Sequence, residues 1–261
     1  MTTGSSPPRP IAFGAFPAWE GAIRGRLDAR YAPSFVDLAN ARLEAFYAVV
    51  PLAHAHYDAL ANRPDLLGRK FLHPSPEAVA LCRDKLGLTR FLIANGLGEF
   101  TPPLRAPGPP YPYIWKRRWG GWGRECHVVD DAAAEHQFNP GDGDWFAQSP
   151  VFGGTEYATH VLRAGGEIRY VLTVTHEAEG DLVIVGERHP SRPISAVRGC
   201  KHLALFAEIL RLVDYEGVAC FDYKMANGRP QIFEINPRFG ASLSLDVTAF
   251  IDAYLAALRP A

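Results

Sequence analysis

Two carboxylates in the last fifth of the chain are spaced in a way that suits a divalent cation. Asp222 and Glu234 are twelve residues apart and flank the turn dipeptide Asn227-Gly228. The segments on either side are rich in β-branched and aromatic residues, which predicts a β-hairpin. If its loop holds an odd number of residues centred on Gly228, the two acids lie directly opposite each other, about 4.5–5.5 Å apart at Cβ. Like charges at that range repel, so we expect a cation between them.

Magnesium is the cation that these side chains predict, and manganese could substitute for it. Mg²⁺ takes one or two carboxylates and completes its octahedron with water and phosphate oxygens. Asn236 follows Glu234 by two residues and adds a carbonyl oxygen on the same face of the strand. Arg238 comes next, and a planar guanidinium suits a transferring phosphoryl group or an acyl phosphate. The alternative is an ordinary hairpin whose acids are solvated beside Lys224 and Arg229.

A second segment with the composition of a phosphate site runs from Tyr111 to Val129. We expect a strand that ends at Lys116, a turn containing Gly120, Gly121 and Gly123, and then another strand. Glycines let backbone N–H groups close over phosphates, and the lysine adds positive charge. The lysine precedes the glycines, and no Ser or Thr follows them, so the segment is not a GxxxxGK[ST] P-loop. A plain hairpin turn is the alternative.

Helix signals surround Lys85. Ser75 and Pro76 suit an N-cap and the first helical position, and apolar residues then recur until Gly96, which suits a helix end. The segment 82–85, Cys-Arg-Asp-Lys, interrupts this apolar pattern. We therefore expect a broken helical stretch with Lys85 at the break.

Length and composition favour a globular protein that acts on small molecules. The chain has 261 residues, of which 48% are hydrophobic, and its net charge is −1 from 27 basic and 28 acidic residues. No basic tract is interleaved with aromatic residues, so neither nucleic acid nor a membrane surface is an expected partner. No apolar run approaches the roughly 18 residues of a membrane span, and no secretory signal is evident. The four cysteines lack CxxC spacing, which favours reduced thiols and a cytoplasmic location.

The N-terminal third reads as a small parallel α/β unit. Apolar segments at 11–16, 44–51 and 69–73 are expected strands, and they are separated by segments of helix length. We therefore expect two domains, an N-terminal one over 1–74 and a larger one over 75–261.

Two features of this unit could bear on function. The segment 17–20 after the first expected strand could face a substrate, because ligands gather at the carboxyl ends of parallel strands, although a surface turn is favoured. His54 and His56 form an HxH pair with no third ligand in view, so a solvated loop is favoured over a metal site.

In this order and spacing, the segments resemble the ATP-grasp enzymes. The last nucleotide-binding strands of that family carry an acid, a second acid twelve residues on, and then Asn, Pro and Arg. Here Glu234-Ile235-Asn236-Pro237-Arg238 matches the family's E-x-N-P-R without a gap. The resemblance covers nearly the whole chain. It implies an α/β protein (α+β in its nucleotide-binding part), with an ATP-grasp fold preceded by a small parallel α/β pre-ATP-grasp domain.

The resemblance also implies roles for individual residues. Lys85 and Lys116 would hold phosphates beneath a mobile flap. Ser149 to Val151 would form the backbone hinge at the adenine edge, and Glu156 would hold the ribose hydroxyls. The remaining implied positions are flap glycines Gly120, Gly121 and Gly123; metal ligands Asp222, Glu234 and Asn236; and Arg238 at the acyl phosphate. The chain departs from the family pattern in its flap, where Trp119 and Trp122 replace small residues and Arg117 replaces a common proline.

The implied activity is an ATP- and Mg²⁺-dependent carboxylate–amine ligase. A small-molecule carboxylate would be activated as an acyl phosphate and attacked by an amine, with release of ADP and phosphate. The resemblance allows a homodimer. Two alternatives stay open, which are a nucleotide-binding regulator or pseudoenzyme on the same fold and a phosphotransferase that acts on a hydroxyl.

Overall fold

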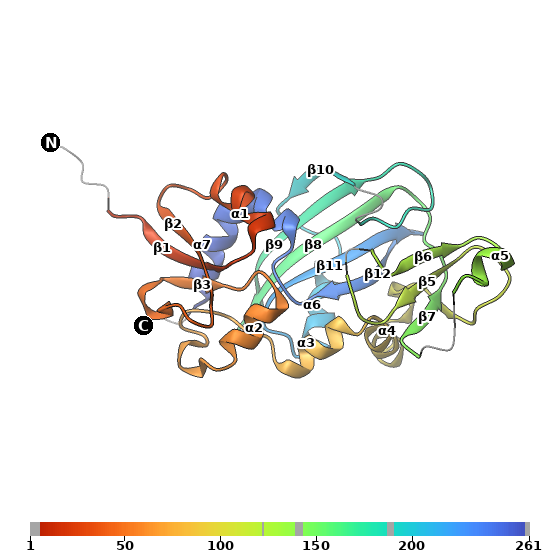
Figure 1. Cartoon of the computed structure of the whole chain (residues 1–261), viewed down its shortest axis with the longest axis horizontal. Coiled ribbons are helices and arrows are strands. Elements are labelled where there is room, and N and C mark those ends of the chain that lie inside the picture. Colours follow the sequence, from red (N-terminus) through yellow and green to blue (C-terminus); the bar gives the residue numbers. More distant parts are fainter. Residues whose placement is uncertain (1–5, 122, 139–142, 187–190, 259–261) are drawn as a thin grey trace.

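Three β-sheets and the helices that pack on them make up the molecule (Figure 1). The structure is a computed structural model that describes residues 6–121, 123–138, 143–186 and 191–258. Trp122 lies outside these ranges. Within them, no helix has the length and apolar character needed to cross a membrane.

The N-terminal sheet is parallel, as predicted, and has three strands in the order β2-β1-β3. Its members are β1 (Arg9–Gly14), β2 (Tyr31–Val36) and β3 (Ala48–Val50). Strands β1 and β3 correspond to the first two predicted strands. Strand β2 was not predicted, because it contains a proline that only an edge strand tolerates. The strand predicted at 69–73 is wrong, since only an isolated bridge between Leu67 and Phe71 forms there.

Two segments predicted as a turn and a loop are helical. Helix α1 (Pro17–Arg24) follows β1 directly. Helix α2 (His54–Leu60) begins with the HxH pair, so the prediction of a solvated loop is wrong. His56 Nδ1 accepts hydrogen bonds from the N–H groups of Leu52 and Ala53, at 3.0 and 3.1 Å. This histidine therefore satisfies backbone donors at the helix start.

The predicted break in the helical stretch is confirmed. Helix α3 (Pro76–Arg83) begins after Ser75, whose hydroxyl accepts from the Ala78 N–H at 3.1 Å. Helix α4 (Lys85–Ala94) begins immediately after Asp84, whose carboxylate accepts from the Gly87 N–H at 2.9 Å. Asp84 thus ends one helix and caps the next, which fixes Lys85 in the first turn of α4.

The second sheet is antiparallel and has four strands in the order β4-β7-β5-β6. It consists of β4 (Leu104–Arg105), β5 (Tyr113–Arg117), β6 (Cys126–Val129) and β7 (Trp145–Gln148), with the short helix α5 (Ala132–Glu135) after β6. The predicted strand–turn–strand around the glycines is confirmed, because β5 pairs with β6 and places Lys116 opposite Cys126.

The third sheet is the largest, with five antiparallel strands in the order β10-β9-β8-β11-β12. Its strands are β8 (Thr155–Ala164), β9 (Glu167–Glu177), β10 (Arg192–Val197), β11 (Gly217–Ala226) and β12 (Arg229–Asn236). Helix α6 (Leu203–Leu212) packs on one face through Phe206, whose ring stacks on Phe221 with centroids 4.3 Å apart.

The β11–β12 hairpin opposes Asp222 and Glu234, as predicted, but by a different route. Its turn has two residues, Asn227 and Gly228, with φ of 50° and 75°, which suits a type I′ turn. A two-residue loop alone would leave the two acids out of register. A β-bulge leaves Phe233 without a partner on β11. Tyr223 pairs with Ile232 and Asp222 pairs with Glu234, so the register shifts by one residue. The bulge thus restores the pairing that an odd loop would give.

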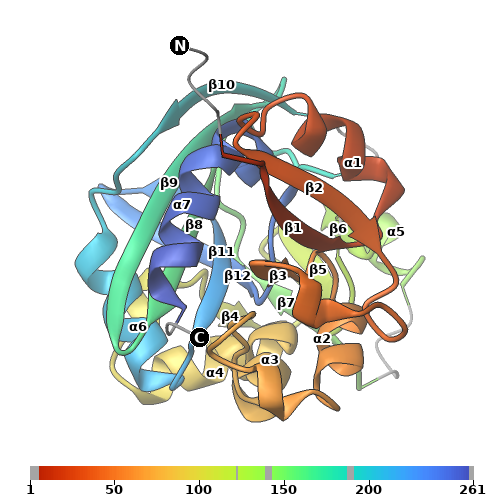
Figure 2. The same ribbon diagram turned by 90° about the vertical axis from the view of Figure 1, so that its left-hand side faces the viewer.

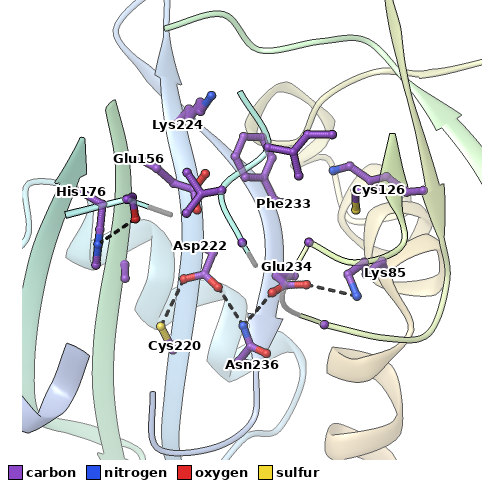
Figure 3. A pocket seen from close by; sticks show the side chains of 18 of the residues that line it. Lys85, Cys126, Glu156, His176, Cys220, Asp222, Lys224, Phe233, Glu234 and Asn236 are labelled. Carbon is purple, nitrogen blue, oxygen red and sulfur yellow. Dashed lines mark hydrogen bonds and ion pairs between the residues drawn. The ribbon is translucent and has the colours of Figure 1, made fainter. Parts of the chain in front are cut away.

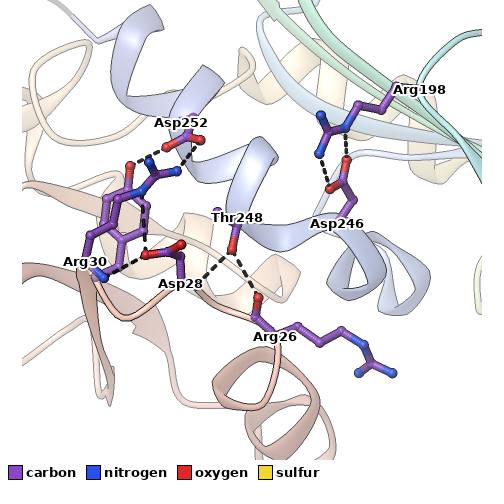
Figure 4. Close-up of polar contacts among 8 residues, drawn as sticks. Arg26, Asp28, Arg30, Arg198, Asp246, Thr248 and Asp252 are labelled. Atoms are coloured by element: carbon purple, nitrogen blue, oxygen red, sulfur yellow. Dashed lines mark hydrogen bonds and ion pairs between the residues drawn. The ribbon is translucent and has the colours of Figure 1, made fainter.

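The C-terminal helix α7 (Val247–Ala257) packs against the N-terminal sheet (Figure 2). Residues of β1, β9 and α7 share one hydrophobic core, which includes Phe13, Leu172 and Phe250. Polar contacts join the same parts, and Thr248 Oγ1 accepts from the Asp28 N–H at 2.9 Å (Figure 4). The two ends of the chain are therefore parts of one core.

Candidate active site

One cavity, about 290 Å³ in volume, is lined by residues of both antiparallel sheets. All twelve residues that the sequence singled out contribute to its wall. They are Lys85, Lys116, Gly120, Gly121, Gly123, Ser149, Val151, Glu156, Asp222, Glu234, Asn236 and Arg238. The fold therefore brings together side chains that are up to 153 positions apart in the sequence, from Lys85 to Arg238.

Strand register arranges the cavity floor in rows. Asp222 lies opposite Glu234 on one side and Ala158 on the other. Two residues further along β11, Cys220 lies opposite Asn236 and His160. Successive rows on one strand face are about 6.8 Å apart. The floor thus has an acid row and, next to it, a row made of an amide, a thiol and an imidazole.

The amide of Asn236 joins the two acids (Figure 3). Its Nδ2 donates to Asp222 Oδ2 at 2.8 Å and to Glu234 Oε1 at 2.9 Å. Cys220 Sγ donates to the other oxygen of Asp222 at 3.3 Å. These contacts restrain the orientation of both carboxylates, and both residues line the cavity.

The pKa values of the two acids shift in opposite directions. Burial, together with the charges of Glu234 and Glu156, raises the pKa of Asp222 well above its ordinary value. Burial acts on Glu234 too, but the Lys85 charge and the Asn236 amide hold the pKa of Glu234 below its ordinary value. Without a cation, Asp222 is therefore the more readily protonated acid of the pair.

Lys85 connects the acid row to the glycine turn. Its Nζ lies 3.1 Å from Glu234 Oε2 and donates to the Gly120 carbonyl at 2.5 Å. The ammonium is almost fully buried, so both contacts form with little solvent around them. One side chain thus links helix α4, strand β12 and the flap.

The bulge residue Phe233 forms part of the cavity wall opposite Lys116. The Lys116 Nζ lies 4.9 Å from the centroid of the Phe233 ring, within cation–π range. Burial lowers the pKa of Lys116, and the nearby Cys126 and Glu234 oppose that shift. The ammonium therefore faces the cavity from an apolar wall, where a phosphate would be a favourable partner.

Two of the flap positions require glycine. Gly120 and Gly123 have φ of 127° and 64°, and a Cβ on Gly123 would lie 2.7 Å from the Val185 carbonyl oxygen. The flap therefore passes close to the segment 182–186, which also lines the cavity. A Cβ added to Gly121 would meet no atom within 4 Å, and Gly121 also lines the cavity.

The predicted hinge and Glu156, the acid predicted to hold the ribose, lie on neighbouring segments. Ser149 and Val151 line the cavity, although the Ser149 N–H is already donated to the Pro103 carbonyl at 2.9 Å. Burial raises the pKa of Glu156 to about 7, with Lys224 and Lys116 opposing the shift and Glu234 adding to it. Glu156 is thus poised to donate a hydrogen bond as well as to accept one.

Arg238 lies between the acid row and the N-terminal sheet. Its Nη2 donates to Asn236 Oδ1 at 3.2 Å, and its Nη1 donates to the Phe239 carbonyl at 3.0 Å. The guanidinium carbon lies 5.7 Å from the ring centroid of Trp19 in α1. The segment after the first strand therefore reaches the cavity. A surface turn was the favoured interpretation of this segment from the sequence.

Several cavity residues were not predicted as site residues, among them Lys224, Phe233, His160 and Ser242. Lys224 is buried, and its Nζ donates to the Val183 carbonyl at 3.0 Å, so it does not solvate the acids at a surface. Phe233 enters through the bulge, which no sequence pattern marks. His160 follows Glu156 by four residues on the same strand face, and that alternation could have identified it. Ser242 lies just beyond the E-x-N-P-R segment.

The donors present fit magnesium better than a metal that needs three or more protein ligands. In the described ranges, no group of three or more His, Cys, Asp and Glu side chains could hold a metal ion. Two facing carboxylates are hard ligands of the kind that Mg²⁺ needs, and the Asn236 oxygen would join them if the amide turned its Nδ2 away from the acids. A cation between the acids would also relieve the repulsion that raises the pKa of Asp222.

No family model and no curated protein matches the sequence. Solved structures do match the fold. D-alanine–D-alanine ligase from Bacillus anthracis is 14% identical with a TM-score of 0.59, over 95% of this chain and 97% of that one. The L-amino acid ligase from Bacillus licheniformis is 16% identical with a TM-score of 0.58, over 98% of this chain and 76% of that one. The ATP-grasp ligase PsnB is 14% identical with a TM-score of 0.59, over 96% and 99%. The chain therefore has the ATP-grasp fold.

Proposed function

We propose that the protein is an ATP- and Mg²⁺-dependent ligase that joins a small-molecule carboxylate to an amine. The observation that carries this proposal is the pair Asp222 and Glu234, held by one amide at 2.8 and 2.9 Å, with Arg238 bonded to the same Asn236. A site that only bound nucleotide would not need opposed acids and an adjoining guanidinium together.

In this proposal the nucleotide lies along the floor of the cavity, beneath the flap. Lys116 and Lys85 contact its phosphates, and the N–H groups of the flap glycines close over them. Glu156 holds the ribose hydroxyls, and the backbone of Ser149 to Val151 faces the adenine. Asp222, Glu234 and Asn236 would hold Mg²⁺, which would neutralise charge on the β- and γ-phosphates.

The proposed reaction begins with attack of the substrate carboxylate on the γ-phosphate. Phosphoryl transfer needs little covalent help from the protein, so positioning and charge neutralisation are the main requirements. Arg238 is placed to stabilise charge on the transferring group, and an acyl phosphate and ADP result. The amine then displaces phosphate from the acyl carbon.

The names of the structural neighbours support the same reaction class. Two of those described above are named as ligases of amino acids, and the third as an ATP-grasp ligase. We therefore propose a small acid, with amino acids as the first candidates, as the substrate that is activated.

Hydroxylamine trapping tests this reaction. Amino acids and other small acids are screened with Mg-ATP, and ADP, AMP and hydroxamate are measured. We expect hydroxamate and ADP to form together, because attack at the γ-phosphate leaves the diphosphate and hydroxylamine captures the acyl group. The matched variants are Arg238→Ala, expected to lower both products by about 10²–10³-fold, and Arg229→Ala, an exposed arginine at the start of β12, expected to lower neither.

The same assay separates the alternatives. ADP release with a hydroxyl substrate and no hydroxamate would indicate a phosphotransferase. Binding of Mg-ATP without turnover of any acid would indicate a regulator. Release of AMP and pyrophosphate would contradict the proposed chemistry.

A further inference from the structure

His160 is a fully buried histidine that the proposed reaction does not use. It lies on β8 in the row next to the acids, opposite Cys220, and its side chain lines the cavity. The segment that follows Arg238 lies directly over the ring, because a Cβ on Gly240 would be 2.5 Å from His160 Cε1. The imidazole therefore supports the loop that begins at Arg238.

The two ring nitrogens of His160 have different surroundings. Nε2 lies 2.8 Å from Ser242 Oγ, while Nδ1 is buried and has no hydrogen-bond partner within the described part of the chain. Burial, with the charges of Arg238 and His176, lowers the pKa of His160 to about 3. The ring is therefore neutral near pH 7 and carries one proton, on one of these nitrogens.

The surroundings indicate which nitrogen carries that proton. On Nδ1, the N–H would point toward Gly240, whose added Cβ would lie 3.2 Å away, and it would meet no acceptor. Buried N–H groups without an acceptor are rare, whereas a bare lone pair is the smaller loss. The proton therefore belongs on Nε2, which donates to Ser242 Oγ. The hydroxyl accepts this bond, so its own hydrogen is available to another partner.

We propose that His160 is a positioning residue that fixes the Ser242 hydroxyl as a hydrogen-bond donor to a carboxylate oxygen of the acid substrate. This inference rests on the proposed function. Ser242 lines the cavity four residues after Arg238, and its hydroxyl forms no further hydrogen bond among the described residues. A hydroxyl donor and a guanidinium on one loop favour an anionic oxygen. The nucleotide phosphates face the lysines and the flap, which leaves the acid as the partner of this loop.

The first test reads the tautomer in the free protein. Two-dimensional NMR of protein with ¹⁵N-labelled histidine, recorded at pH 7, distinguishes protonated from bare ring nitrogens, and His160→Gln identifies the His160 signals. We expect a neutral ring with the proton on Nε2. A proton on Nδ1, or on both nitrogens, would overturn the proposal whatever the protein catalyses.

The second test measures binding of simple acids. Acetate, L-alanine and succinate are titrated calorimetrically into protein saturated with Mg²⁺ and the non-hydrolysable analogue AMP-PNP. We expect Ser242→Ala to weaken the tightest of the three by about 10–150-fold, since a charge-assisted hydrogen bond is lost. The affinity for AMP-PNP should not change, because Ser242 donates to the acid.

Matched variants separate positioning from packing. Ser244→Ala makes the same chemical change two residues away, where the hydroxyl donates to the Ala241 carbonyl at 2.7 Å, and it should leave acid binding unchanged. His160→Leu should weaken acid binding as Ser242→Ala does, while His160→Gln, which keeps an N–H donor, should preserve most of it.

Equal acid affinities in wild type and Ser242→Ala, or no binding of any of the three acids, would overturn the proposal. Failure to bind AMP-PNP would instead contradict the proposed function, and the NMR result would still stand.

Discussion

The pKa values of Asp222 and Glu234 shift in opposite directions because the two acids have different neighbours. Glu234 has the Lys85 ammonium 3.1 Å away, whereas Asp222 accepts only from an amide and a thiol. A nearby cation favours the ionised carboxylate, whereas burial beside another negative charge favours the protonated one. The asymmetry follows from Lys85 lying on the Glu234 side of the pair.

Removal of one acid should abolish turnover without unfolding the protein. For Asp222→Asn we expect acid-dependent ADP release to fall by at least about 100-fold, because a proposed metal ligand is lost. The metal-free variant should be at least as stable as wild type, since repulsion between the acids is relieved. A coupled ADP assay and urea unfolding measure the two effects. The control is Asp58→Asn, an exposed acid in α2; near wild-type turnover in Asp222→Asn would contradict the metal assignment.

Glu156 should make the stability of the free protein depend on pH. Its pKa is about 7 in the folded chain against 4.5 ordinarily. Between these values the native carboxyl holds a proton that the unfolded chain has released, so stability falls as pH rises through this window. Between pH 4.5 and 7.5, the free energy of unfolding of Glu156→Gln should fall by roughly 2–3 kcal/mol less than that of wild type. Urea unfolding across this range measures the difference, and parallel curves would refute it.

The sequence predicted the polar members of the cavity better than its apolar and buried ones. The E-x-N-P-R segment and the glycine turn carry their chemistry in residue types, so spacing was enough to find them. Phe233 and Trp19 contribute through packing, which depends on a bulge and on a helix that no short pattern marks. The Ser149 hinge stays a prediction, because its N–H is bonded to Pro103 in this structure.

At the scale of elements, the β-bulge allows one hairpin to serve two purposes. Both Ile232 and Ile235 face the core on α6, while Phe233 and Glu234 both face the cavity. Strict alternation along a strand would not allow two adjacent residues to share a face. The extra residue therefore adds an aromatic wall opposite Lys116 without disturbing the paired acids.

Helix α1 links the N-terminal sheet to the chemistry through Trp19. This side chain is 6% exposed and packs between Phe16 and Phe239, with ring centroids 4.5 and 6.0 Å away. Trp19→Ala should lower stability by about 3–5 kcal/mol, because a large buried ring is lost. Trp19→Phe should retain much of the packing and provide a folded variant for kinetics.

The kinetic consequence of Trp19→Phe should be specific to Arg238. We expect a lower kcat for acid-dependent ADP release with little change in the KM for ATP, since the guanidinium loses part of its cation–π contact. Trp115→Phe provides the control, because Trp115 is equally buried in the core of the other sheet and does not line the cavity. Equal kinetics in wild type and both variants would show that Trp19 does not position Arg238.

Element prediction failed where tertiary context decides. Strand β2 carries a proline and pairs on one side only, so its sequence lacks the usual strand signal. The apolar segment at 69–73 looks like a strand, yet Phe71 is buried among Leu60 and Leu66 without pairing along a sheet. The helical stretch broken at Asp84 and the hairpins at the glycine turn and at Asn227-Gly228, with caps and turns of their own, were predicted correctly.

At the scale of the whole molecule, Tyr254 joins segments that are far apart in the sequence. Its hydroxyl accepts from the Leu72 N–H at 2.8 Å and donates to the Val49 carbonyl at 3.1 Å. Tyr254→Phe should therefore lower the free energy of unfolding by about 1–3 kcal/mol, because a buried N–H and a buried carbonyl lose their partner. Urea unfolding measures the loss. Tyr47→Phe, at a 53% exposed tyrosine, should change stability little, and a similar loss in both variants would contradict the assigned role.

The shared core of β1 and α7 has a consequence for how the chain folds during synthesis. Strand β1 emerges early, but its partners Phe250 and Tyr254 lie near the other end of the chain. Ribosomes add roughly 5–20 residues per second, so Phe13 waits on the order of ten seconds or more for this core to close. During that interval the apolar face of the first sheet is exposed, and contacts of such high sequence separation also form slowly. We therefore expect newly made chains to depend on chaperones more than the modest size of the protein would suggest.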